Sequence, residues 1–156
     1  MERGEPMRRG FWRLLFWSYL LLLFIVVILK FTGSWQDLLA RMESEPYGKT
    51  YNLEPFATIK IQLQYWSESW ARFNLVGNTI PFIPFGFLLP MTYRKKCSLF
   101  KTLLLGLLFI LFSEALQFYT NLGTFDVDDI ILNMAAIFVG YLPVGIAGLF
   151  RKPKKK

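Results

Sequence analysis

The sequence predicts an all-α integral membrane protein, in which one domain of residues 1–156 forms a bundle of four transmembrane helices. Two observations predict this fold class. Hydrophobic residues make up 54% of the chain, which is more apolar surface than a small globular domain can bury. Four long runs carry almost no charge, and each approaches the roughly 17–25 residues with which a helix crosses a bilayer.

The first predicted span covers residues 12–31. Its centre, Leu14–Leu29, has 16 residues without a charge, and Arg13 and Lys30 can flank it because their long side chains reach the membrane surface. A basic start before an apolar run is also typical of a signal peptide. This run is too long for one, and no A-x-A-like cleavage site follows it, so we expect an uncleaved helix.

The longest connection, residues 32–71, follows the first span. Its apolar residues at helical spacing predict a short helix on the outer membrane surface: Trp35, Leu38, Leu39 and Met42. The stretch TIKIQLQYW (58–66) alternates apolar and polar residues, which fits a short strand, while Trp66, Trp70 and Phe73 also fit the rim of a helix. In either case, the density of Trp and Tyr indicates a membrane interface.

The second predicted span, residues 73–93, contains the motif NTIPFIPFGFLLP. Pro81 and Pro84 lack the N–H groups that would bond the carbonyls of Gly77 and Ile80, so we expect a helix that is broken or kinked at these prolines. Two interpretations follow. Neighbouring helices could seal the break, or the break could line a polar intramembrane cavity, because exposed backbone inside a membrane needs protein or water to satisfy it.

The last two predicted spans cover residues 99–121 and 128–150, and a tight turn joins them. The fourth begins with FDVDDIILN, in which Asp126 fits the N-cap and Asp129 the third helical position. Capping explains two acids but not Asn133. Asp126, Asp129, Asn133 and Gly140 form one stripe at helical spacing, polar at its top and small at its base, as expected of a face packed on a partner.

The charges predict an orientation. Of the 18 Lys and Arg residues, 13 lie beside the termini or the second connection, so the positive-inside rule places both termini in the cytoplasm. Basic clusters in these positions meet anionic lipid, and we expect no nucleic-acid partner. The chain has one cysteine, Cys97, and no histidine, which excludes a disulfide within the chain, a thiolate metal site and the usual zinc ligand.

Glu114 lies inside the third span, where an ionised carboxylate facing lipid would cost about 2.5–3.5 kcal/mol. It must therefore face the bundle, find hydrogen-bond donors or stay protonated because of desolvation, with Arg72 as a possible charge partner. An antiparallel bundle would gather a polar set near the outer leaflet: Asn74, Asn78, Glu114, Gln117, Asp126, Asp129 and Asn133. Such a set could hold a divalent cation on Asp126, Asp129 and Glu114, move a proton, or bind a lipid-linked or glycan substrate. It could also simply join the helices.

Four motifs in order carry a family resemblance: NLEPF (52–56), N…NTIPFIPFGFLLP (74–90), SEALQ (113–117), and DVDDIILN (126–133) ending in GY (140–141). Across roughly residues 14–145, the chain resembles the VanZ-like family. By position, the resemblance implies that the functional residues are Asn52, Pro55, Phe56, Asn78, Phe82, Pro84, Phe85, Gly86, Glu114, Gln117, Asp126, Asp129 and Asn133, with Lys30 closing the first span.

The resemblance implies a role in resistance to teicoplanin-class lipoglycopeptides in the plasma membrane of a bacterium, typically Gram-positive. The first hypothesis is a protein that binds or alters cell-envelope components through an outward polar cavity, in contact with membrane lipids, a lipid-linked cell-wall precursor or the lipoglycopeptide. The alternative is an intramembrane hydrolase or transferase that acts on a lipid-linked cell-wall substrate with Glu114 and Asp129. A small transporter or scaffold subunit is a third.

Overall fold

The computed structural model describes residues 4–29, 35–43, 51–93 and 98–149. Lys30, Cys97 and the basic tail lie outside these residues. The elements follow one another in this order: α1 (Gly4–Leu29), α2 (Trp35–Glu43), β1 (Tyr51–Asn52), α3 (Ala57–Gln64), α4 (Ser69–Thr79), the 3₁₀ turn η1 (Ile80–Phe82), α5 (Ile83–Tyr93), α6 (Leu99–Tyr119), β2 (Phe125–Asp126) and α7 (Val127–Leu149).

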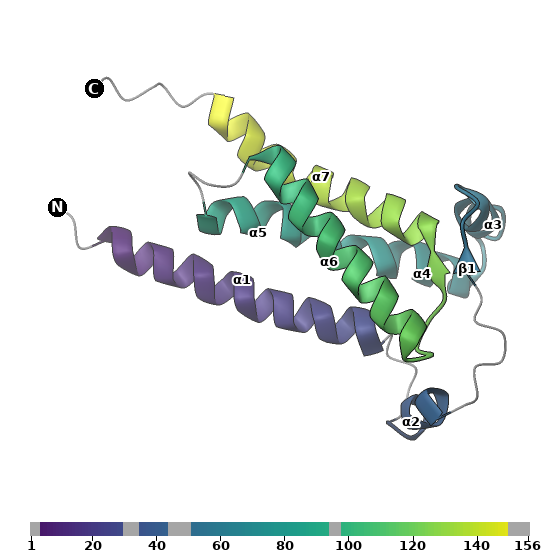
Figure 1. Ribbon diagram of the computed structural model, residues 1–156. Coiled ribbons are helices and arrows are strands. Elements are labelled where there is room, and N and C mark those ends of the chain that lie inside the picture. The colour runs from purple at the N-terminus through teal and green to yellow at the C-terminus, as the bar shows by residue number, and fades with distance from the viewer. Residues whose placement is uncertain (1–3, 30–34, 44–50, 94–97, 150–156) are drawn as a thin grey trace.

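The all-α membrane fold is confirmed. Within the described ranges, four stretches are long and apolar enough to cross a bilayer: Gly10–Val27 in α1, Ser69–Tyr93 in α4 to α5, Leu99–Tyr119 in α6 and Val127–Gly148 in α7. The beginning of α1 and the end of α7 lie at one end of the bundle (Figure 1). At the opposite end, which we call the carboxylate end, lie α3, the short β1–β2 pair and the start of α7.

The connection between the first two spans contains two helices, one at each of the two segments whose residue spacing predicted regular secondary structure. The helix predicted at Trp35 is confirmed as α2. The TIKIQLQYW stretch, whose period fitted either a strand or a helix, forms α3 over most of its length. A two-residue strand, β1, precedes α3 and pairs in parallel with β2.

The second span is interrupted between α4 and α5 by the turn η1. The N–H of Ile83 donates to the carbonyl of Ile80, so a 3₁₀ bond satisfies the carbonyl that Pro84 cannot serve. On the other side of the turn, the Tyr19 hydroxyl of α1 donates to the Pro81 carbonyl at 2.6 Å. A neighbouring helix therefore serves the interrupted backbone, in agreement with the sealed-break interpretation. That the prolines themselves cause the interruption stays a prediction.

α5 and α7 touch backbone to backbone. A Cβ atom built on Gly86 would lie 1.9 Å from the carbonyl oxygen of Ile137, and one built on Gly140 would lie 1.9 Å from the carbonyl oxygen of Ile83. Each helix thus places a glycine against the main chain of the other, the arrangement by which membrane helices approach closely. The small base predicted for the α7 stripe is confirmed at Gly140.

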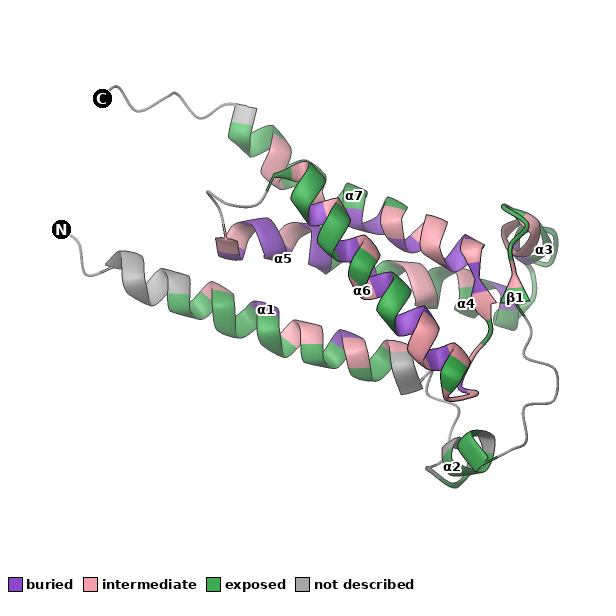
Figure 2. Cartoon of the chain, viewed as in Figure 1, coloured by how far each residue is buried: buried purple, intermediate pink, exposed green. Residues whose placement is uncertain are grey.

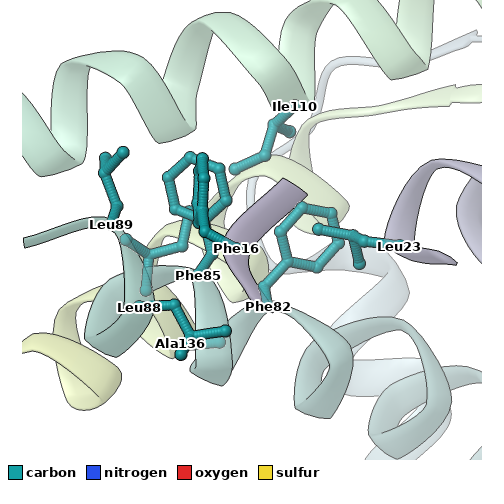
Figure 3. Close-up of a cluster of buried hydrophobic side chains, with 9 residues drawn as sticks. Phe16, Leu23, Phe82, Phe85, Leu88, Leu89, Ile110 and Ala136 are labelled. Atoms are coloured by element: carbon teal, nitrogen blue, oxygen red, sulfur yellow. The ribbon is translucent and has the colours of Figure 1, made fainter. Parts of the chain in front are cut away.

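The hydrophobic core fills the space between these helices (Figure 3). Its buried members come from every span: Phe16 and Leu23 of α1, Phe82, Phe85, Leu88 and Leu89 around η1 and α5, Ile110 of α6, and Ala136 and Ile137 of α7. The outward faces of α1 and α6 remain exposed (Figure 2); Leu14 and Phe100, for example, keep 70% and 73% of their surface. Lipid covers such faces in a membrane protein.

Candidate functional site

Three aspartates begin α7, and all are buried. The Asp126 carboxylate accepts the backbone N–H of Asp128 at 2.9 Å, which is the bond of an N-cap. The predicted capping role of Asp126 is therefore confirmed. Asp128 and Asp129 both lie in the first turn, where the helix dipole favours negative charge.

Asp126 also holds the segment Tyr51–Ile59, which we call the strap. The Asn52 amide donates to Asp126 at 3.1 Å, and the Thr58 hydroxyl donates to the other carboxylate oxygen at 2.6 Å. The same amide donates to the Thr58 hydroxyl at 3.0 Å, so the three side chains form a closed ring of hydrogen bonds. The strand pairing sets their register, because Asn52 lies opposite Asp126.

Asp128 holds the strap at a second point. Its two carboxylate oxygens accept the backbone N–H groups of Phe56 and Ile59, at the start of α3. Phe56 adopts a left-handed conformation with φ of 68°, and no side chain of its own segment caps α3. An acid of α7 thus caps a helix that lies about 70 residues earlier in the chain.

A buried polar interior lies on the bundle side of these acids. Glu114 is only 3% exposed, and its carboxylate accepts the backbone N–H of Asp126 at 3.5 Å. Gln117, one turn further along α6, donates to the Val27 carbonyl of α1 at 2.7 Å. Glu114 therefore faces the bundle rather than lipid, as its cost in lipid requires.

Among the residues that the structure describes, three oxygen atoms in this interior have no hydrogen-bond partner: Ser113 Oγ, Gln117 Oε1 and Asn133 Oδ1. Ser113 and Gln117 are four residues apart on α6, and Asn133 lies on the buried face of α7. Two contacts set the alignment of the helices, because Glu114 meets Asp126 and Gly106 meets Ile137. At 1.5 Å per residue, these two contacts put Ser113 and Asn133 about 4.5 to 9 Å apart along the bundle axis, which is roughly one to two helical turns.

The other predicted residues lie apart from this interior. Asn74 is exposed and Asn78 is half-buried on α4, and within the described residues neither side chain is hydrogen-bonded to the acids. The prediction that Arg72 pairs with a carboxylate is wrong. Its guanidinium donates to the carbonyls of Trp66 and Ser67 at 2.9 and 2.7 Å, because the turn between α3 and α4 directs those carbonyls toward it.

The comparison with known families now becomes decisive. Residues 16–149 match the family model described as VanZ/LLP1. The chain belongs to the VanZ/LLP1 family. The matched range contains the strap, the polar interior and the α5–α7 contact. No curated protein and no solved structure matches the chain.

Sequence reasoning missed two residues of this VanZ/LLP1 site. Asp128 lies off the α7 stripe and had no predicted role, yet it is completely buried. Ser113 belongs to the motif SEALQ, in which only Glu114 and Gln117 were predicted as site residues. Its spacing of four residues from Gln117 was the signal that places it on the buried face.

Glu114, Asp126 and Asp129 are the predicted metal ligands of the VanZ/LLP1 site. Within the part of the chain that the structure describes, no group of three or more Cys, Asp or Glu residues could hold a metal ion. Both oxygens of Asp126 accept hydrogen bonds from the strap. A divalent cation on Asp126, Asp129 and Glu114 stays a prediction, and we base no proposal on it.

Replacing Asn133 with leucine should stabilise the protein. The substitution is close in shape and removes a buried oxygen without a partner, a group that costs about 1–3 kcal/mol when left unsatisfied. We expect a higher midpoint of thermal unfolding in detergent, with Asn133→Ala as the control that removes the same oxygen but leaves a void. A lower midpoint for Asn133→Leu would show that the amide is bonded in the folded protein and would contradict the assignment.

Proposed function

We propose that this VanZ/LLP1 protein lowers susceptibility to teicoplanin-class lipoglycopeptides at the outer leaflet of the bacterial plasma membrane. It does so by binding or altering an envelope component at the polar interior between α6 and α7. Family membership supports the resistance role. The distribution of basic residues supports an outward carboxylate end, because positively charged connections stay in the cytoplasm.

The observation that carries the proposal is the set of unpartnered oxygens on Ser113, Gln117 and Asn133. Native proteins leave few buried polar groups unsatisfied, and those that they leave are often functional. The cost is largest where no bulk water can reach the group. A ligand that brings hydroxyl or amide N–H donors would satisfy all three, and glycans and lipid-linked cell-wall precursors carry both.

Glu114 gives the interior a second function-bearing group. An ionisable residue within a membrane span is expensive to keep and marks a functional site by default. Here it lies at the closed end of the interior, beneath the backbone of Asp126. A carboxylate in this position can accept hydrogen bonds from the same donor-rich ligand.

The test is drug susceptibility in a sensitive Gram-positive host that expresses the native chain or one of four variants. Glu114→Gln and Asn133→Leu alter the interior, and Asp129→Asn alters the second candidate acid. Gly148→Ala is the matched control, because a Cβ there meets nothing within 4 Å. With membrane levels equalised, the native chain and the control should raise the inhibitory concentration of teicoplanin, and vancomycin should change little. Asn133→Leu should abolish the effect although the protein is at least as stable.

Two outcomes would overturn the proposal. A native chain that leaves teicoplanin susceptibility unchanged removes the resistance role for this protein. A resistance effect that survives both interior variants removes the polar interior as its site. Partial activity in Glu114→Gln fits a binding site, whereas complete loss in both Glu114→Gln and Asp129→Asn fits the intramembrane hydrolase or transferase.

A further inference from the structure

The strap is built with its polar groups toward the protein and its apolar groups away from it. Asn52 and Thr58 bond Asp126, and the backbone of Phe56 bonds Asp128. Tyr51, Leu53 and Phe56 instead expose 67%, 61% and 52% of their surface. A loop in water has the opposite arrangement, because exposed apolar area costs about 25 cal/mol per Å². The outward face of the strap therefore needs an apolar partner.

The depth of the strap follows from the residues that hold it. Asp126 and Asp128 flank Val127, the first residue of the span Val127–Gly148. A segment bonded to both carboxylates lies level with the boundary of that span. The second span begins at Ser69, shortly after α3 ends. Two spans thus place the strap at the height where hydrocarbon meets headgroups.

α3 continues the same surface. Ile61, Leu63, Tyr65 and Trp66 are all about half exposed or more, and Trp70 and Phe73 carry the exposed face into the second span. Tyr and Trp prefer the membrane interface, because their rings are apolar at one end and polar at the other. Exposed apolar residues therefore run from the strap through α3 into the second span.

We infer that the strap is a lipid-embedded cover of the polar interior: its apolar side chains contact the boundary of acyl chains and headgroups, while Asp126 and Asp128 hold its polar side over Glu114. The inference does not depend on the resistance role. It assigns the partner of this surface as the membrane itself rather than a second copy of the chain or a soluble protein. It also places the strap between the polar interior and the lipid.

The experiment measures lipid contact one residue at a time. In a Cys97→Ser background, which removes the single native cysteine, cysteines replace Leu53, Phe56 and Glu54 in separate full-length proteins and carry a bimane label. Each protein is reconstituted in phosphatidylglycerol vesicles with or without bromine at carbons 6 and 7 of the acyl chains. Glu54 is the matched control, because it is an exposed acid between the two apolar positions.

Bimane at residues 53 and 56 should be quenched several-fold more by brominated lipid than bimane at residue 54, which iodide in the water should quench instead. Tyr51→Cys gives a second strap position if one variant fails to fold. Equal quenching at all positions by iodide would overturn the inference, since the strap would then face water. A spontaneous disulfide between two copies at residue 53 would also overturn it, since another protein would cover the surface.

Discussion

Replacing Asp128 with alanine is expected to release the strap and the start of α3 from the bundle. The carboxylate accepts two backbone N–H groups, from Phe56 and Ile59, in a place that is completely buried. Hydrogen bonds to a charged acceptor contribute about 1.5–3 kcal/mol each. The loss should therefore be about 3 kcal/mol or more, and Phe56 would lose the contact that holds its left-handed backbone.

Hydrogen exchange followed by mass spectrometry would show this release directly. In Asp128→Ala, the amides of residues 51–64 should lose protection while those of α5 and α7 keep it. In Asp128→Asn, the protection of residues 51–64 should lie between that of the native protein and that of Asp128→Ala. One side-chain oxygen can still accept a hydrogen bond, but the new amide N–H group opposes the second N–H donor. Glu54→Ala is the control, since the hydrogen bonds of Glu54 within the described residues use its backbone: its N–H donates to Asn52 at 3.0 Å, and its carbonyl accepts the N–H of Ala57 at 3.4 Å. Unchanged protection in Asp128→Ala would mean that other contacts hold the strap.

Replacing Gly86 with alanine is expected to force α5 and α7 apart. The added methyl carbon would lie 1.9 Å from the carbonyl oxygen of Ile137, and a backbone atom cannot rotate away as a side chain can. Overpacking of this kind costs about 1–3 kcal/mol and sometimes more, so the midpoint of thermal unfolding in detergent should fall clearly. Gly140→Ala should behave alike, because its methyl carbon meets the Ile83 carbonyl at the same distance.

The same span provides a matched control. At Gly77 a methyl carbon meets only the Phe73 ring, at 4.0 Å, so Gly77→Ala should be neutral or gain up to about 1 kcal/mol from helix propensity. The double variant Gly86→Ala/Gly140→Ala should lose less than the sum of the single losses, because one separation of the helices relieves both contacts. If Gly86→Ala and Gly77→Ala unfolded alike, the close contact would not be what stabilises the pair.

The spans could be predicted from the sequence because their signal is local. The length of an uncharged run such as Leu14–Leu29, and its lack of charge, are enough to predict a membrane span. The N-cap of Asp126 was predictable for the same reason, since cap and helix are adjacent. The period of residues 58–66 was not decisive, because Trp66 and its neighbours satisfy either a strand or a helix, and only docking on Asp128 selects the helix.

The partners within the site could not be predicted, because they are far apart in the chain. Asn52 and Asp126 are 74 residues apart, and nothing in either neighbourhood specifies the other. Arg72 was assigned to a carboxylate because of its charge, yet two nearby carbonyls satisfy it. The sequence shows that Gly86 is small, but it does not show that the backbone of Ile137 lies against it. That contact depends on how α5 and α7 pack.

The separation between the strap and its acids has a consequence for biosynthesis. The ribosome makes Phe56 and Thr58 long before Asp128 and Asp126, their partners 72 and 68 residues later. Until the last span has left the translocon, the strap has no acceptors for its donors. The nascent protein is therefore open at this end while it is being inserted, and arrival of the final helix closes it.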